Sequence, residues 1–346
     1  MGWSITRIFG FILLAVLIWQ FFLYYLTAKR PGSDCSSYTC SILSTGGKYR
    51  QQTNSSHLLW EPDGCTLRHR TLHENVQCMM DIAEKKDKVP IVAFAGDSRI
   101  RQLRDEFIHQ ITGNDSDMVA NPSLIVNEDW YRRHDFRADF FPSASVNVHF
   151  EWSPFIDLGQ DSLIQFLTRI IGMTCWLPDI LILGSGIWNA RDCSRFNRTE
   201  SECVLEYKSS FQALLLLLER LPLSTEIIWI PQSILNESTI NRPKDPFFKV
   251  GLKSGTLIPY NNAVKEILAS NSGRRIIYWD SLYIASRQLA DGLDGVHFGL
   301  KSKQQMMQLL MNWICNKYDH DRFSPAWGLV YKKPLSNSFC CARKCS

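Results

Sequence analysis

Two short segments of this 346-residue sequence carry side chains suited to nucleophilic catalysis. Gly96-Asp97-Ser98 places a serine directly after an apolar run, while Asp294 and His297 lie three residues apart on a glycine-punctuated loop. A histidine can take the proton of a serine hydroxyl while a carboxylate fixes the histidine's tautomer and stabilises the imidazolium. These residues therefore predict acyl transfer through a serine.

Each segment also has a simpler interpretation when it is taken alone. Asp and Ser are among the commonest N-cap residues, so the tripeptide alone favours a helix cap, and we expect Asp97 to cap the helix even if Ser98 is catalytic. A lone Asp-x-x-His is often a solvated turn. Of the eight histidines, however, His297 alone combines a nearby acid with a loop that follows a predicted strand.

The elements around Ser98 favour the catalytic interpretation. The continuous apolar run 89–95, bounded by proline and glycine, is typical of a buried parallel strand. After Ser98, apolar residues recur at helical spacing on one face, namely Ile100, Leu103, Phe107, Ile108 and Ile111. Ser98 would then lie at a helix N-terminus, where free N–H groups and a partial positive charge can stabilise an oxyanion.

Strands and helices alternate through the rest of the chain. Further helices are predicted over about 161–173, 207–220, 261–270 and 302–317, and further strands over 179–183, 226–230 and 275–279. This alternation predicts an α/β fold with a mainly parallel sheet covered by helices on both faces. Ligands of such sheets bind at the carboxyl ends of the strands, where Ser98, Gly184 and the residues after Trp279 fall.

The N-terminus predicts a membrane anchor. Residues 8–28 contain no charged side chain, and a helix of about 20 apolar residues spans a bilayer, whereas a signal-peptide core has about 7–15. A cleaved signal peptide is the alternative. We expect a type II membrane protein with a cytosolic tail at 1–7, a signal-anchor at 8–28, a stem and cysteine-bearing lead-in at 29–88, a catalytic domain at 89–320 and a cysteine-containing tail at 321–346.

Glycosylation and cysteine patterns place the catalytic part in the secretory lumen. Tentative N-x-S/T glycosylation sites occur at Asn54, Asn114, Asn197 and Asn236. Eleven cysteines are many for a cytosolic enzyme, and their clustering near both ends predicts disulfides that join the tails to the core. The odd count leaves one thiol unpaired or paired with another chain.

Charge and motifs argue against several functional classes. A net charge of +4 on so long a chain, without a basic run, argues against nucleic-acid binding. No zinc-type spacing of cysteine and histidine, no carboxylate cluster with cation spacing and no G-x-x-x-x-G-K-S/T motif occurs. We therefore expect neither a bound metal nor a bound nucleotide cofactor.

The two motifs resemble those of the SGNH (GDSL-type) esterase superfamily. Longer stretches are similar to the luminal catalytic domain of the sialic acid O-acetyltransferases, relatives of the fungal capsule O-acetylation proteins. They are residues 95–103 (AGDSRIRQL), the Trp60-x-Pro62-x-x-Cys65 lead-in, residues 293–297 (LDGVH), residues 311–317 (MNWICNK) and the Cys340-Cys341 pair. The resemblance covers roughly residues 40–341.

The resemblance implies an SGNH-like three-layer α/β/α domain preceded by one transmembrane helix, and a role for each matched residue. Ser98 would be the nucleophile, Asp294 the orienting acid and His297 the general base. The backbone N–H of Ser98 would donate to the oxyanion, and Gly184 marks a second expected donor.

For other matched or neighbouring residues, the resemblance implies a less specific role. Arg99 and Arg101 would either contact the carboxylate of an acidic sugar or solvate the helix. The superfamily's Gly-x-Asn-Asp block would place an asparagine at position 186, where this sequence has Gly186; Asn189 lies three residues further on.

The resemblance implies O-acetylation of sialic acid or a related glycan through an acyl-serine, by a Golgi membrane enzyme with a luminal catalytic domain. Its partners would be a sialylated or other glycan and an acetyl donor derived from acetyl-CoA, with no bound cofactor. The alternatives are a glycan O-acetylesterase with the same triad and an inactive glycan-binding relative, against which the intact triad argues.

The resembling proteins continue into a multi-span membrane domain. Because this sequence ends at Ser346, we expect a fragment, a truncated isoform or a standalone luminal enzyme supplied with acyl groups by a separate membrane protein.

Overall fold

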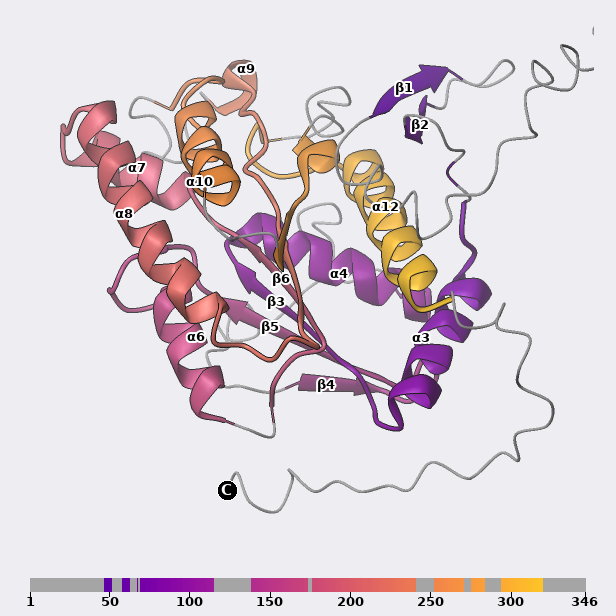
Figure 1. Cartoon of the computed structure of the whole chain (residues 1–346). Coiled ribbons are helices and arrows are strands. Elements are labelled where there is room, and N and C mark those ends of the chain that lie inside the picture. Colours follow the sequence, from indigo (N-terminus) through magenta and orange to yellow (C-terminus); the bar gives the residue numbers. More distant parts are fainter. Residues whose placement is uncertain are drawn as a thin grey trace, which may run out of the picture.

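The structure, a computed structural model, is shown in Figure 1. It describes residues 47–51, 58–62, 67, 69–114, 138–173, 176–240, 252–270, 275–283 and 294–319. The predicted anchor at 8–28 and tail at 321–346, the sequon at Asn54 and seven of the cysteines lie outside the described residues. Among the helices that are described, none has both the length and the apolar character needed to cross a membrane.

A six-stranded sheet in the order β4-β5-β3-β6-β7-β8 forms the centre of the molecule. Its strands are β3 (Ile91–Gly96), β4 (Ala138–Phe141), β5 (Val146–Trp152), β6 (Ile180–Gly184), β7 (Glu226–Trp229) and β8 (Ile276–Tyr278). All neighbouring pairs are parallel except β4 and β5. The mainly parallel sheet expected from the sequence is confirmed. A separate hairpin pairs β1 (Gly47–Gln51) with β2 (Leu58–Pro62).

Helices cover both faces of this sheet (Figure 1). One face carries α3 (Leu72–Lys86), α4 (Ser98–Thr112) and α12 (Leu300–Asp319). The other carries α6 (Leu163–Gly172), α7 (Ile187–Arg195), α8 (Glu200–Leu218) and α10 (Ile258–Ser270), with the short α9 (Glu237–Ile240) beyond β7. The result is three layers with a hydrophobic core on each side of the sheet.

The alternation of side chains along β3 shows how the sequence builds both cores. Val92 and Phe94 lie in the core beneath α3, α4 and α12, while Ala93 and Ala95 lie in the core beneath α6, α8 and α10. Successive strand residues point to opposite faces, so a strand buried on both sides must be apolar throughout. This explains why the run 89–95 identifies a central strand.

Capping residues set several helix starts. Thr71 and Thr199 form capping boxes with Glu74 and Glu202, and Ser162 caps α6. Helix α8 therefore begins at Glu200, well before the predicted 207. The sequence patterns did not predict α3, α7, α9, β1, β2, β4 and β5.

Two disulfides join helices to one another. Cys78 of α3 is bonded to Cys315 of α12, and Cys193 of α7 is bonded to Cys203 of α8. Helix α3 also packs against α4 and α12, so this part of the predicted lead-in belongs to the packed core. All four described cysteines are therefore in disulfides. The cysteines of the tails lie outside the described residues.

Candidate active site

The turn between β3 and α4 presents Ser98. Strand β3 ends at Gly96, whose φ is +153°, and a Cβ built there would lie only 2.1 Å from the carbonyl oxygen of Gly184. The turn therefore requires glycine at position 96. Asp97 is the N-cap of α4 and accepts a hydrogen bond from the Arg99 N–H at 2.9 Å, which confirms its expected structural role. Ser98 is then the first residue of α4.

Ser98, His297 and Asp294 form one continuous hydrogen-bonded chain. The Nε2 atom of His297 lies 2.7 Å from Ser98 Oγ, and its Nδ1 atom lies 2.5 Å from Asp294 Oδ2. The second carboxylate oxygen of Asp294 accepts the backbone N–H groups of Val296 and His297, both at 2.8 Å. This loop conformation aims the carboxylate at Nδ1 and leaves Nε2 to accept the serine proton, the arrangement of a general-base triad.

The charge state of Asp294 suits this role. Burial by itself would raise the pKa of Asp294, but the hydrogen bond and charge of His297, together with two backbone N–H groups, hold that pKa well below its ordinary value. Asp294 is therefore ionised at neutral pH. An ionised carboxylate keeps the proton on Nδ1 and favours the imidazolium that forms when Nε2 takes the serine proton.

Arg99 is buried beneath the triad and connects three loops. Its Nε donates to the carbonyl of Val296 at 2.8 Å, and its Nη1 lies 3.2 Å from Gln232 Oε1 and 3.1 Å from the Ser233 carbonyl. Burial lowers the pKa of Arg99 to about 10, so it remains a cation at neutral pH. Neither expected role, sugar contact or solvation of the helix, describes this position, because the side chain is only 1% exposed. Arg99 holds the histidine loop and the loop after β7 against the nucleophile turn.

Gln102, one turn after Ser98, makes a second connection to the histidine loop. Its side-chain amide exchanges two hydrogen bonds with the backbone of Phe298. Gln102 belongs to the matched AGDSRIRQL stretch, but its role was missed because its partner is a backbone segment 196 residues away. Its position four residues after Ser98 on α4 is the one signal in the sequence that could have suggested it.

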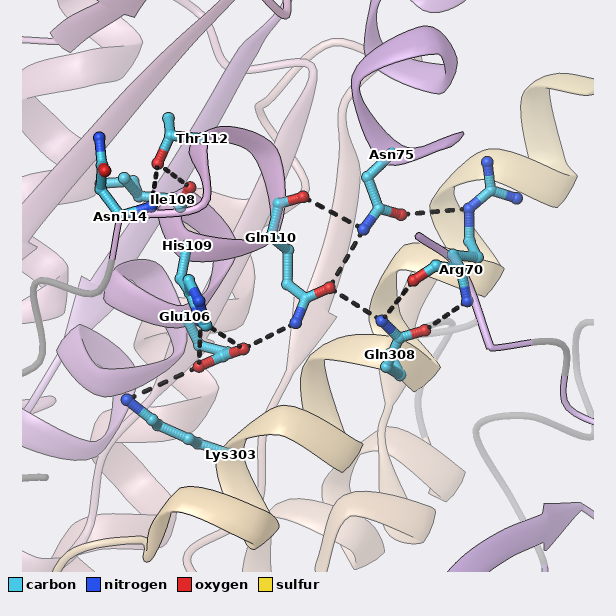
Figure 2. A network of polar contacts seen from close by, with 10 residues as sticks. All are labelled: Arg70, Asn75, Glu106, Ile108, His109, Gln110, Thr112, Asn114, Lys303 and Gln308. Carbon is cyan, nitrogen blue, oxygen red and sulfur yellow. Dashed lines mark hydrogen bonds and ion pairs between the residues drawn. The ribbon is translucent and has the colours of Figure 1, made fainter. Parts of the chain in front are cut away.

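A buried polar network ties α4 to α12 further from the triad, as Figure 2 shows. Gln308 of α12 donates to Gln110 of α4 at 2.8 Å, and Lys303 lies 3.6 Å from Glu106, with both charged side chains fully buried. Burial raises the pKa of Glu106 even though the positive charge of Lys303 opposes the rise. Because α12 begins three residues after His297, this network fixes the helices on which both halves of the triad depend.

The remaining tentative site residues, Gly184, Asn189 and Arg101, lie on β6, α7 and α4. Gly184 ends β6, and a Cβ there would lie 2.6 Å from Ile100 Cδ1, so its lack of a side chain lets α4 pack on the strand. Asn189 lies on α7, where its Oδ1 is 3.5 Å from Ser185 Oγ. Arg101 is partly exposed on α4, three residues after Ser98. Their parts in oxyanion or substrate binding remain predictions.

Three predicted glycosylation positions are described. Asn114 and Asn197 are exposed, whereas Asn236 is partly buried and its backbone N–H donates to Gly295 in the histidine loop at 2.9 Å. In the part of the chain that the structure covers, no group of three or more His, Cys, Asp or Glu side chains is arranged to hold a metal ion.

Comparison with known proteins finds a relative by sequence. The chain is 24% identical over 282 residues to the N-acetylneuraminate (7)9-O-acetyltransferase of Danio rerio; the match covers 82% of this chain and 31% of that protein. The chain thus spans about a third of the length of this curated relative. No family model matches.

Comparison with solved structures finds matches of low identity and low TM-score. They include a GDSL-like lipase from Parabacteroides merdae, described as putative, with 15% identity, a TM-score of 0.35 and coverage of 67% of this chain and 97% of that one. An acetylxylan esterase from Geobacillus stearothermophilus has 12% identity, a TM-score of 0.35 and coverage of 65% and 94%. TM-scores this low are no basis for inferring a function from these structures. The function proposed below therefore rests on the triad geometry and on the relative found by sequence.

Proposed function

We propose that this protein is a serine-dependent O-acyltransferase that passes an acetyl group to a hydroxyl of sialic acid or a related glycan. The observation that carries the proposal is the chain of hydrogen bonds from Asp294 through His297 to Ser98. The relative named for O-acetylation of N-acetylneuraminate supports the choice of acceptor.

The geometry suggests two successive half-reactions. His297 Nε2 takes the proton of Ser98 Oγ as that oxygen attacks the acetyl carbonyl of the donor. The tetrahedral intermediate carries an oxyanion next to the N-terminus of α4, where the Ser98 N–H can donate to it, with Gly184 and Asn189 as further candidate donors. Collapse expels the donor's leaving group, which takes the proton back from His297 and leaves acetyl-Ser98.

The second half-reaction reverses these roles with a new acceptor. A sugar hydroxyl gives its proton to His297 Nε2 and attacks the acetyl-serine carbonyl. The acyl–oxygen bond to Ser98 breaks, Oγ recovers the proton, and the acetylated sugar leaves. Attack by water instead would release acetate, so a glycan O-acetylesterase is the second candidate function. The intact hydrogen-bonded triad favours both over an inactive glycan-binding protein.

The cellular setting is part of the proposal. We place the catalytic domain in the Golgi lumen, attached to the membrane by residues 8–28, with exposed Asn114 and Asn197 as glycosylation sites. The acetyl donor would derive from acetyl-CoA and reach the site through a membrane protein, in this chain's longer form or separate from it.

The test compares the full chain with its Ser98→Ala variant. We expect intact-mass analysis to detect an acetyl group on wild-type protein after exposure to p-nitrophenyl acetate, and none on Ser98→Ala. Ser201→Ala, which changes an exposed serine of α8, is the matched control. Equal turnover by Ser98→Ala and wild type would refute the triad.

Transfer and hydrolysis separate in a second assay. Wild-type protein is given an acetyl donor with a sialylated acceptor, and O-acetylated sialic acid alone. Acetylated acceptor in the first reaction supports the transferase, while acetate release in the second without acceptor modification supports the esterase.

A further inference from the structure

Asn261 of α10 is hydrogen-bonded to both backbone groups of one residue in the loop after β7 (residues 230–236). Its Oδ1 accepts the N–H of Gln232 at 2.8 Å, and its Nδ2 donates to the Gln232 carbonyl at 2.7 Å. Both residues are buried, so loss of this amide would leave two buried backbone groups without their partner. The loop after β7 is thus attached to α10 at Gln232.

This pairing repeats, on the other face of the sheet, the pairing that Gln102 makes with the histidine loop (residues 294–298). Gln102 of α4 exchanges two hydrogen bonds with the backbone of Phe298. Helices α4 and α10 cover opposite faces of the sheet (Figure 1). Two loops are therefore each held by an amide side chain, one from each helical layer.

Arg99 joins these two loops. Its Nη1 lies 3.2 Å from Gln232 Oε1 and 3.1 Å from the Ser233 carbonyl, and its Nε donates to the Val296 carbonyl at 2.8 Å. The backbone of Gln232 is the part of the loop that Asn261 holds, and its side chain is a part that Arg99 contacts. A continuous set of hydrogen bonds therefore runs from α10 to the histidine loop.

A second connection between the two loops does not involve this arginine. The backbone N–H of Asn236 donates to the carbonyl of Gly295 at 2.9 Å. Gly295 and Val296 are the two residues that separate Asp294 from His297. The loop after β7 is thus connected to both residues between the acid and the base, directly at one and through the arginine at the other.

We propose that Asn261 is a positioning residue for His297, acting from the layer opposite α4 through the loop after β7. While Asn261 holds the Gln232 backbone, the acceptors of Arg99 keep their places and the histidine loop stays against the nucleophile turn. Without it, the loop after β7 is released from α10, and the 2.7 Å contact of His297 with Ser98 is lost in part of the population. The inference rests on the proposed function, in which His297 is the general base.

The first measurement is turnover of p-nitrophenyl acetate by the full chain and by Asn261→Ala. We expect kcat to fall by about 10- to 100-fold, because a small displacement of a catalytic group slows the chemical step, and KM to stay within about twofold. The matched control is Asn262→Ala, the same substitution at the exposed neighbouring residue of α10, which should change neither constant.

Asn261→Asp adds a readout that depends on the pairing itself. When protonated, the new carboxyl group can accept from the Gln232 N–H and donate to the Gln232 carbonyl, as the amide does; when ionised it can only accept. We expect its kcat, relative to wild type at the same pH, to approach the wild-type value as pH falls. If Asn261→Asp were as impaired as Asn261→Ala at every pH, the proposal would be overturned.

Hydrogen exchange tests the connection without any chemistry. In the full chain, Asn261→Ala should speed the exchange of backbone N–H groups in residues 232–236 and also in residues 294–298, while Asn262→Ala should leave both segments as in wild type. If Asn261→Ala does not unfold cooperatively, Asn261→Asp above the pKa of its new carboxyl group takes its place in both measurements.

The outcomes separate this positioning role from the proposed chemistry. Faster exchange confined to residues 232–236, with kcat unchanged, would overturn the inference, because Asn261 would then hold only the loop that it contacts. If the wild type does not turn over the ester, faster exchange in both segments still upholds the connection from Asn261 to the histidine loop. That combination would refute only the acyl-transfer function.

Discussion

Gln102 and Phe298 exchange two hydrogen bonds across 196 residues of sequence. Gln102 Nε2 donates to the Phe298 carbonyl at 3.0 Å, and the Phe298 N–H donates to Gln102 Oε1 at 2.9 Å. Gln102 and Phe298 are both buried, so the backbone N–H and carbonyl of Phe298 cannot turn to water instead. The pair attaches the residue after His297 to the helix that begins with Ser98, and so fixes the separation of the His297 and Ser98 side chains.

Gln102→Ala should therefore impair catalysis through geometry. We expect kcat for p-nitrophenyl acetate to fall by up to about 100-fold with a smaller change in KM, because a displacement of about 1 Å in a catalytic group can have this effect. Gln102→Glu, which keeps the acceptor for the Phe298 N–H, should fall between Ala and wild type. Gln212→Ala, on the exposed side of α8, is the control. A loss of activity that only parallels the loss of folded protein would contradict a positioning role.

Asp294→Asn should lower kcat strongly while the free energy of unfolding changes little. An amide in place of the carboxylate no longer holds the proton on Nδ1 of His297, and the corresponding change in a serine protease with a Ser-His-Asp triad lowers kcat by about 10⁴-fold. Steady-state kinetics with an activated acetyl ester would measure it. Asp280→Asn, which removes an exposed pairing with Lys265, should remain within about twofold of wild type, as surface ion pairs contribute little. Comparable rates for the two variants would contradict the assigned role.

The buried Glu106–Lys303 pair predicts a stability pattern that depends on both partners. Glu106→Gln leaves the Lys303 ammonium buried without its carboxylate and should lower the free energy of unfolding by about 3–5 kcal/mol. The double variant Glu106→Gln/Lys303→Met should recover most of that loss, because no unpaired charge remains. Urea unfolding at pH 7 measures all three proteins. A double variant less stable than Glu106→Gln would contradict this account.

Lys303→Met alone should make stability depend on pH through Glu106. Burial already raises the pKa of Glu106 in the folded chain, and loss of the lysine charge raises it further. A carboxyl group with a raised folded pKa favours folding while it is protonated. Its contribution is therefore fully present below the unfolded pKa of about 4.3 and is lost as pH rises through the folded value. Relative to wild type, Lys303→Met should lose stability as pH rises above the unfolded pKa of about 4.3, and a stability difference that does not change with pH above that value would disprove the coupling.

The two disulfides should differ in their effect on stability. Cys78–Cys315 spans 237 residues and Cys193–Cys203 spans 10. Since loop-closure entropy grows with loop length, Cys78→Ser/Cys315→Ser should lower the free energy of unfolding by about 4–5 kcal/mol and Cys193→Ser/Cys203→Ser by about 2–3 kcal/mol. Denaturant unfolding of each pair variant measures both losses, and a larger loss from the short loop would reverse the expectation.

The elements that could be predicted from sequence are those that a pattern within one short stretch of residues identifies. The apolar runs that became β3, β6 and β7 identify strands buried on both faces, and the spacing from Ile100 to Ile111 identifies α4. Strand β5 was not predicted, because His149 and Glu151 give it a polar pattern. Both are buried, and Glu151 Oε1 is paired with Arg169 of α6, a partner that the strand's own sequence does not reveal.

The reactive groups of the triad could be recognised from residue types and spacing. Ser98, Asp294 and His297 have the chemistry that acyl transfer through a serine requires, and both segments follow predicted strands. The spacing of three residues also places Asp294 within reach of the His297 imidazole through one short loop, which the hydrogen bond between them confirms.

How the two segments meet depends on the folded chain. The 2.7 Å contact between Ser98 and His297 joins residues 199 apart, and it depends on Arg99 and Gln102 being buried against the histidine loop. In the sequence alone, Arg99 has the character of a solvent-facing or ligand-binding side chain. Burial and long-range hydrogen bonds set its role, because desolvated polar groups must find partners wherever the fold places them.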